Sequence, residues 1–261
     1  MKRLVVNADD FGFTCDVNQG IVDAHRDGIL TATTLMATGG AFDDAVRLAR
    51  ENPGLDVGCH LALVGAPGLP ENIPGLVRAM ALGKIRVYDE MASQVRKLLD
   101  AGLKPTHLDT HKHTHLLPPV LEAVARISEA FAIPWVRRPF DFPLHAGRVA
   151  WPKRAVSKTF GLVRGRFEAV LSGHRCRSTD HFAGFQITGN YGARELAALI
   201  RALPEGSTEF MCHPGRCTEE LRSARTRLKE SRERELRALT SAEVRVALRE
   251  AGVELVSYRE L

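Results

Sequence analysis

Near its start the chain reads Leu4-Val5-Val6-Asn7-Ala8-Asp9-Asp10, a short apolar run that ends in two adjacent acids. A run of this length between polar residues is typical of a strand that is buried on both faces. Such strands form parallel sheets, because helices cover both faces of those sheets. The sequence therefore predicts a buried strand over residues 4–8 with two carboxylates at its carboxyl end.

Segments of the same kind alternate with amphipathic helices along the rest of the chain. Further strands are expected at residues 31–36, 56–63, 106–110, 135–137, 209–212 and 253–258, and helices at residues 16–26, 42–51, 89–101, 118–130, 193–202 and, with many charges, between 219 and 250. Residues 64–87 are rich in Gly and Pro and are expected to form a long loop, whereas residues 139–190 resist assignment. Alternating strands and helices predict an α/β fold, and about seven parallel strands in this length favour a distorted (β/α) barrel.

Length and composition set further limits. A chain of 261 residues is as long as one α/β barrel, so we expect a single domain over residues 1–261. No apolar run reaches the roughly 20 residues of a membrane span, and the acids at residues 9 and 10 interrupt any signal-peptide core. The five cysteines are widely spaced and form no Cys-x-x-Cys pair, which indicates reduced thiols. We therefore expect a cytoplasmic protein.

The net charge of +5 is concentrated in part of the chain. Residues 153–177 contain one acid, Glu168, and seven basic residues: Lys153, Arg154, Lys158, Arg164, Arg166, Arg175 and Arg177. A charge-rich segment is most often a solvated face, and the alternative is attraction to an anionic membrane surface or to an acidic substrate. No basic helix with interleaved aromatic residues is present, so no nucleic-acid partner is expected.

Acids and histidines stand where four of the predicted strands end. They are Asp9 and Asp10, His60, Asp109 and His111, and His213. The carboxyl ends of parallel strands meet at one mouth of the sheet, where active sites of α/β proteins are built. Four separate segments are therefore expected to bring carboxylates and imidazoles to one place. Adjacent residues of a strand point to opposite sides, so Asp9 and Asp10 are expected to have different tasks.

A second pattern surrounds Asp109. In the segment His107-Leu-Asp109-Thr-His111-Lys-His113-Thr-His115, a His or Asp occupies every second position, so an extended backbone would place all five on one face. Imidazole and carboxylate together suit Zn²⁺ and related divalent ions. Five ligands are too many for one such site, so some of these side chains are expected to orient the others.

One Asp and two His around a metal, with a second Asp as base and a further His as acid, make an amide or ester hydrolase. A phosphoester hydrolase with similar ligands is an alternative, and the basic segments suit phosphate. A non-catalytic carbohydrate-binding protein is another, but it needs no free carboxylate beside a metal, and two Trp and three Tyr give little surface for stacking on sugars.

Several of these segments together resemble one protein family, the YdjC-like carbohydrate deacetylases, which include chitooligosaccharide deacetylase. The segments that carry the resemblance are Val6-Asn7-Ala8-Asp9-Asp10-Phe11-Gly12-Phe13, Gly28-Ile29-Leu30-Thr31-Ala32-Thr33-Thr34, Val57-Gly58-Cys59-His60, His107-Leu108-Asp109-Thr110-His111 and Met211-Cys212-His213-Pro214. They occur in the family's order and reach from the N-terminal strand to residue 214. The combination is specific, although each segment alone is modest.

The resemblance implies a fold of polysaccharide-deacetylase type and a divalent metal, Mg²⁺ or Zn²⁺. By motif position, Asp10, His60 and His111 correspond to the metal ligands, Asp9 to the catalytic base and His213 to the acid that protonates the leaving amine. The implied reaction removes the N-acetyl group from an oligosaccharide or glycolipid that contains N-acetylglucosamine. His113 and His115 match the histidine-rich segment of the family without an assigned role, and Lys112 replaces its usual second histidine.

Residues 174–182, His-Arg-Cys-Arg-Ser-Thr-Asp-His-Phe, resemble a branch of the family that is linked to hopanoid biosynthesis. Members of that branch act on an N-acetylglucosaminyl lipid. A lipid substrate predicts peripheral membrane contact through the basic residues 153–177. An acetamido sugar or glycolipid is thus the expected small-molecule partner. The sequence does not decide whether the protein forms a homodimer.

Overall fold

The computed structural model describes residues 1–142 and 162–261, and in these ranges one parallel sheet organises the fold. Its strands are β1 (Lys2–Phe11), β2 (Ala32–Leu35), β3 (Asp56–Leu61), β4 (His107–Thr110), β5 (Trp135–Val136), β6 (His181–Ala183), β7 (Gly206–Cys212) and β8 (Val253–Leu255). Seven of them follow the order β5-β4-β3-β2-β1-β7-β6, and β8 pairs with the first residues of β1.

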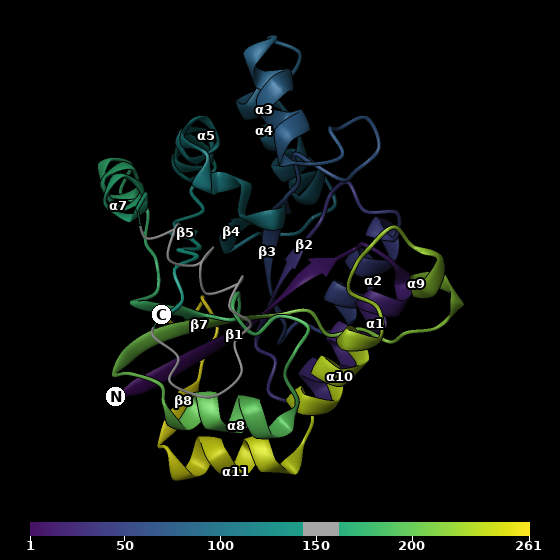
Figure 1. The fold of residues 1–261 in the computed structure, drawn as a ribbon, viewed down its shortest axis with the longest axis vertical. Coiled ribbons are helices and arrows are strands. Elements are labelled where there is room, and N and C mark those ends of the chain that lie inside the picture. Colours follow the sequence, from purple (N-terminus) through teal and green to yellow (C-terminus); the bar gives the residue numbers. More distant parts are fainter. Residues whose placement is uncertain (143–161) are drawn as a thin grey trace.

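Helices surround the sheet (Figure 1). They are α1 (Cys15–Arg26), α2 (Phe42–Glu51), α3 (Ile73–Ala81), α4 (Val87–Asp100), α5 (Pro118–Ala130), α7 (Arg164–Gly173), α8 (Ala193–Arg201), α9 (Glu219–Ser223), α10 (Glu230–Leu239) and α11 (Ala242–Glu250). The two ends of the strand path approach each other, because Trp135 of β5 bridges to Arg177 and Asp141 bridges to Phe182 of β6. The predicted distorted barrel of about seven parallel strands is therefore confirmed, as a curled half-barrel.

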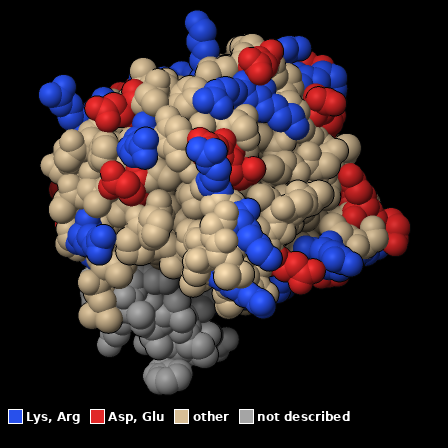
Figure 2. All heavy atoms as spheres, turned by 90° about the horizontal axis from the view of Figure 1, so that it is seen from above, with Lys and Arg blue, Asp and Glu red and all other residues tan. Residues whose placement is uncertain are grey.

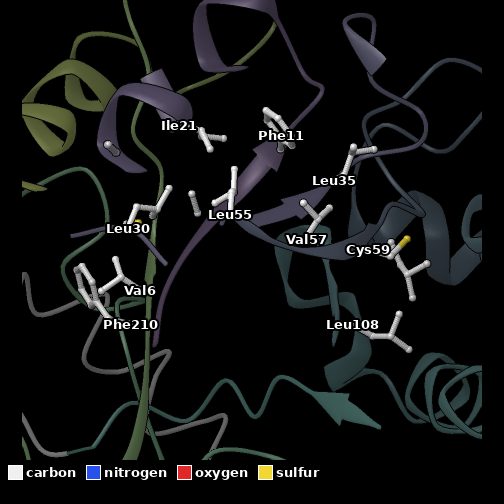
Figure 3. Close-up of a cluster of buried hydrophobic side chains, with 14 of the residues drawn as sticks. Val6, Phe11, Ile21, Leu30, Leu35, Leu55, Val57, Cys59, Leu108 and Phe210 are labelled. Carbon is white, nitrogen blue, oxygen red and sulfur yellow. The ribbon is translucent and has the colours of Figure 1, made fainter. Parts of the chain in front are cut away.

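The main core lies between the outer face of the sheet and the helices. Alternate residues of β1, among them Val6 and Phe11, pack there against Ile21 of α1 and against side chains of neighbouring strands such as Leu35 and Phe210 (Figure 3). Near-complete burial of such side chains contributes about 1.5–3 kcal/mol each relative to exposure. This packing fixes the strands whose carboxyl ends carry the polar residues.

The opposite face of β1 points into the half-barrel and changes in character along the strand. Val5 belongs to a small apolar cluster with Trp135 and Tyr258. Two residues further on, Asn7 bonds to His107 of β4, whose Nε2 lies 3.0 Å from Asn7 Oδ1. The interior is thus apolar at one end and polar from Asn7 onward, toward the carboxyl ends of the strands.

Two expectations about the backbone were wrong. Residues 64–87 are not a long loop throughout, because α3 begins at Ile73 with Asn72 as its N-cap, whose side chain accepts a hydrogen bond from the backbone N–H of Gly75. The strand that contains His107 ends at Thr110 as predicted, but the residues after it form the 3₁₀ helix η1 (His111–Leu116) and not an extended backbone. Lys112 and His113 have φ angles of 54° and 51°, so residues 107–115 do not form one extended face.

Lys and Arg are interspersed with Asp and Glu over the face shown in Figure 2. Of the basic residues in the segment 153–177, Lys153, Arg154 and Lys158 lie outside the described residues. Arg164 pairs with Glu168, and Arg177 stacks on the ring of Trp135 at 4.0 Å. In the described ranges, no helix is both long and apolar enough to span a membrane.

Candidate metal centre and its pocket

The two adjacent acids at the end of β1 both face one pocket. The register of β1 with β2 shifts between Ala8 and Phe11, and Asp10 has a φ of 69°, a left-handed conformation that Asp tolerates better than most residues. This irregularity brings both carboxylates to the same side, whereas a regular strand would have sent them to opposite sides. They still contact different partners.

Asp10 meets the histidines of two neighbouring strands. Its Oδ1 lies 3.4 Å from Nε2 of His60 and 3.2 Å from Nδ1 of His111, and these two nitrogens are 3.2 Å apart. A Zn²⁺ ion held tetrahedrally at about 2.0–2.1 Å from each ligand separates the ligand atoms by about 3.3–3.4 Å. Oδ1 of Asp10 is buried and has no hydrogen-bond partner within residues 1–142 and 162–261, so the donor set fits a divalent cation.

The orientation of His60 is set by Asp109. Nδ1 of His60 lies 2.7 Å from Asp109 Oδ1, and Thr34 Oγ1 donates to the other carboxylate oxygen at 3.0 Å. With the proton on Nδ1, Nε2 presents its lone pair toward Asp10 and His111. A carboxylate that fixes the tautomer of a histidine in this way is a regular partner of protein metal sites.

Charges in the cluster shift the pKa values of its members. Burial lowers the pKa of His60, but the carboxylates of Asp109 and Asp10 outweigh burial and raise it to about 10. Burial raises the pKa of Asp10, but the guanidinium of Arg232 and the neighbouring imidazoles hold it well below its usual range. The carboxylates around His60 thus favour a positive charge at this position. A divalent cation would supply that charge in place of the proton on His60, since a metal ligand has to be deprotonated.

Arg137, at the end of β5, joins three carboxylates inside the half-barrel. Its Nη1 and Nη2 donate to the two oxygens of Asp9 at 2.7 and 2.6 Å, Nη1 also lies 2.8 Å from Asp109, and Nε donates to Glu209 at 2.7 Å. Burial raises the pKa of Asp9, but Arg137 outweighs burial, so the pKa of Asp9 is lowered and its carboxylate is ionised at neutral pH.

Asp9, His60 and Asp109 form a second group with metal-ligand spacing. Both oxygens of Asp9 already accept hydrogen bonds from Arg137, and those of Asp109 contact His60, Thr34 and Arg137. These four oxygens thus have partners, whereas Oδ1 of Asp10 has none among the described residues. The group around Asp10 is therefore the better metal site.

His213 follows β7 and faces Asp9, with its Nε2 3.9 Å from Asp9 Oδ2. Burial lowers its pKa, and Asp9 only partly opposes this effect. Its backbone N–H donates to Glu235 of α10 at 2.6 Å. The loop that follows His213 packs closely against α1. At Gly20 of α1 a Cβ atom would lie only 2.4 Å from the Cα of Gly215, so a larger residue does not fit there.

The other histidines of the alternating segment have separate environments. His107 is buried below the pocket, stacked on Tyr258 at 4.0 Å. His115 contacts the hydroxyl of Thr110, and its Nε2 lies 3.1 Å from the carbonyl oxygen of Arg137. His113 lines the pocket, and burial holds its pKa well below the usual value.

The pocket above these residues has a volume of about 430 Å³, in the range of small-molecule sites. It contains Asp9, Asp10, His111 and His213 at its polar end. The remaining wall is mainly apolar or basic and includes Phe13, Met36, Val64, Phe185, Met211, Leu228, Lys112, Arg225, Arg227 and Arg232.

The YdjC-like protein family model matches residues 3–250, which include every residue of this site. The chain belongs to the YdjC-like family. Two relatives named carbohydrate deacetylase, from Brevibacillus brevis and Clostridium beijerinckii, are 30% and 31% identical to it. Each alignment covers 99% of this chain and 99% or 100% of the relative. A solved structure of a proposed cellobiose-phosphate cleavage protein from Enterococcus faecalis is 28% identical, with a TM-score of 0.75 over 99% of this chain and 98% of that one.

Three residues of this YdjC-like site were missed by the sequence analysis, namely Arg137, Arg232 and Glu235. Arg137 carried a usable signal, because it is a charged residue at the end of a predicted buried strand. Arg232 and Glu235 come from a charged helical stretch in which exposed and buried residues are mixed. Their contacts with Asp10 and His213 span more than 20 residues of chain, so spacing alone gave no indication of them.

Proposed function

We propose that this protein is a divalent-metal-dependent carbohydrate N-deacetylase. It hydrolyses the acetamide of an oligosaccharide or glycolipid that contains N-acetylglucosamine, giving acetate and a free amine. The observation that carries the proposal is the group of Asp10, His60 and His111 at the end of a pocket that an ionised Asp9 and His213 also line. The full-length relatives named carbohydrate deacetylase support the reaction class.

Asp10, His60 and His111 would hold the metal, for which Mg²⁺ and Zn²⁺ are the first ions to test. When bound, the metal polarises the amide carbonyl and lowers the pKa of a water molecule in the site. Asp109 contacts Nδ1 of His60, which leaves Nε2 as the atom that would bind the metal. Arg137 fixes the carboxylate of Asp9, which takes the proton of the attacking water.

His213 delivers a proton to the amine that leaves. Its lowered pKa makes it neutral at pH 7, so it has to gain a proton before it acts as an acid. Asp9 holds the proton of the attacking water, and its Oδ2 lies 3.9 Å from Nε2 of His213. Proton passage from Asp9 to His213 and on to the amine thus uses a short path, and it returns both side chains to their starting states.

The test is acetate release by enzyme reconstituted with Zn²⁺ or Mg²⁺ from di-N-acetylchitobiose and from an N-acetylglucosaminyl lipid, with the chelated enzyme as control. Release from either substrate that depends on added metal supports the proposal. Release from the lipid alone assigns the enzyme to the hopanoid-type reaction, and release from the soluble sugar assigns it to oligosaccharides. No release from either substrate, with metal bound, refutes deacetylation of these substrates.

The lipid alternative has a second test, because none of residues 174–182 lines the pocket. Within this segment, His174 contacts Glu122 and Glu129 of α5. A membrane-borne substrate predicts binding to anionic liposomes, lost when the basic residues of the segment 153–177 are neutralised. Absence of binding removes the support for peripheral membrane contact.

Phosphoester hydrolysis is the second candidate function. The observation in its favour is that Lys112, Arg225 and Arg227 line the pocket and suit an anionic group. A panel of phosphate esters separates it from amide hydrolysis. Phosphate release without acetate release would replace the first proposal.

A further inference from the structure

Arg232 of α10 has one buried donor group that the protein leaves unused. Its Nη2 donates to Oδ2 of Asp10 at 2.5 Å, and its Nε donates to the carbonyl oxygen of Leu228 at 3.2 Å. Nη1 is buried and finds no hydrogen-bond partner in the described part of the chain. The residue is only 2% exposed, yet it lines the pocket beside Asp10 and His111.

A buried, unpaired guanidinium N–H is unfavourable, because the group loses its hydrogen bonds to water without gaining a partner in the protein. Most buried polar atoms in proteins have partners, and exceptions often lie at functional sites. Arg232 lines the pocket, where its guanidinium lies 6.0 Å from the ring centre of Phe13, another residue of the pocket wall. A hydrogen-bond acceptor of the bound ligand is the partner that would satisfy it.

The position of Arg232 indicates which ligand atom this is. One oxygen of Asp10 accepts from Arg232, and the other lies within 3.4 Å of His60 and 3.2 Å of His111. The guanidinium therefore adjoins the end of the pocket where the acetamide reacts. Arg225 and Arg227, by contrast, are exposed side chains of the pocket wall and suit the distal part of a ligand.

We propose that Arg232 is a catalytic residue whose Nη1 donates a hydrogen bond to the acyl oxygen of the substrate. The inference rests on the proposed deacetylation. As the water oxygen bonds to the acyl carbon, the carbonyl π electrons move onto the acyl oxygen, and Nη1 stabilises the charge that develops there. When the C–N bond breaks, its electron pair leaves on nitrogen, which takes the proton from His213, and the carbonyl re-forms in the acetate product. A charged donor fixed before the reaction is effective in this role, since it needs no reorganisation.

The test compares Arg232→Lys and Arg232→Gln with the wild type on the acetamido substrate that the wild type hydrolyses fastest. Arg234→Gln is the matched control, because Arg234 is an exposed arginine of the same helix. Loss of one donor to a developing oxyanion lowers kcat by roughly 10²–10³-fold, so we expect this loss in both variants, with a smaller change in KM. The control variant keeps the wild-type kcat. Circular dichroism and titration with Zn²⁺ by calorimetry establish that the variants are folded and bind metal.

Binding of acetate to the Zn²⁺-loaded proteins gives a readout that does not depend on turnover. The product carboxylate presents an oxygen to Nη1, so acetate affinity should fall at least about tenfold in Arg232→Gln while Zn²⁺ affinity changes less. Full recovery of kcat at saturating Zn²⁺ would show that Arg232 only positions Asp10. A raised KM with unchanged kcat would show that Nη1 binds the sugar and not the acyl oxygen. Either result overturns the inference. Failure of the wild type to release acetate refutes the proposed function instead.

Discussion

Replacement of Arg137 by lysine should destabilise the protein strongly although the charge is kept. The guanidinium makes four contacts of 2.6–2.8 Å with three buried carboxylates, and a lysine ammonium lacks the planar fork that reaches all of them. Loss of two charged hydrogen bonds at about 1.5–3 kcal/mol each gives a decrease of about 3–6 kcal/mol in the free energy of unfolding. Typical domains have only about 5–15 kcal/mol in total.

The assay is urea denaturation at pH 7 followed by circular dichroism. Arg138→Lys is the matched control, because this neighbouring arginine pairs with the partly exposed Glu168, and such surface pairs contribute about 1 kcal/mol or less. A decrease below about 1 kcal/mol in Arg137→Lys would refute the reasoning, since it would mean that the fork contributes no more than a surface pair.

The same variant has a defined effect on pH dependence. Burial raises the pKa of Asp9 and Arg137 lowers it, so weakening the fork leaves burial less opposed and raises the pKa. The ionised base is then lost at a higher pH, and the acidic limb of kcat/KM moves upward. For the fold, a carboxylate with a lowered pKa stabilises above its unfolded value of 3.8, and this stabilisation is lost as the pH falls through the folded pKa. The variant should therefore also unfold at a higher pH during acid titration; an unchanged acid limb and acid midpoint would contradict this account.

Three further substitutions test the roles of individual groups. Asp9→Asn should retain Zn²⁺ binding by calorimetry and lose roughly 10²–10⁴-fold in kcat, as expected for removal of a general base; a fully active variant would exclude Asp9 from that role. Asp109→Asn should weaken metal binding about 10–100-fold, because His60 loses the partner that orients it; unchanged affinity in the same titration would show that Asp109 is dispensable for the metal. Glu235→Gln should lower kcat more than Zn²⁺ affinity, since Glu235 accepts a hydrogen bond from the backbone N–H of His213. A larger loss of Zn²⁺ affinity than of kcat would show that Glu235 acts on the metal site instead.

The sequence predicted the strands of the sheet other than β6, because each of them carries its own local signal, whereas β6 lies in the stretch 139–190 that resisted assignment. Helices 42–51 and 118–130 have the predicted bounds, since apolar periodicity and the prolines at residues 118 and 119 are local features. The 3₁₀ helix after Thr110 was missed because alternation of His and polar residues is equally compatible with a strand. Lys112 and His113 adopt left-handed conformations, which the pattern of residue types does not indicate.

At the site, too, residues in local motifs were predicted and contacts between distant residues were not. Asp10, His60 and His111 were predicted to lie together from strand ends and family resemblance, and the structure places their ligand atoms within 3.4 Å of one another. Their assignment as metal ligands stays a prediction. Arg232 and Glu235 escaped notice because a helix without an apolar motif gives no indication of which charged residues turn inward. Buried ion pairs across the fold are found only once the packing is known.

The pairing of β1 has a consequence for synthesis on the ribosome. Residues 2–8 of this strand pair with β7, and residues 2–4 also pair with β8. At about 5–20 residues per second, the roughly 200 residues between β1 and β7 take about 10–40 s to translate. During that interval β1 has an open edge of unpaired backbone groups, the kind of segment that templates aggregation. Shielding of the nascent chain by a chaperone should therefore increase the yield of active protein, more so than for a barrel whose strands pair only with their neighbours in sequence.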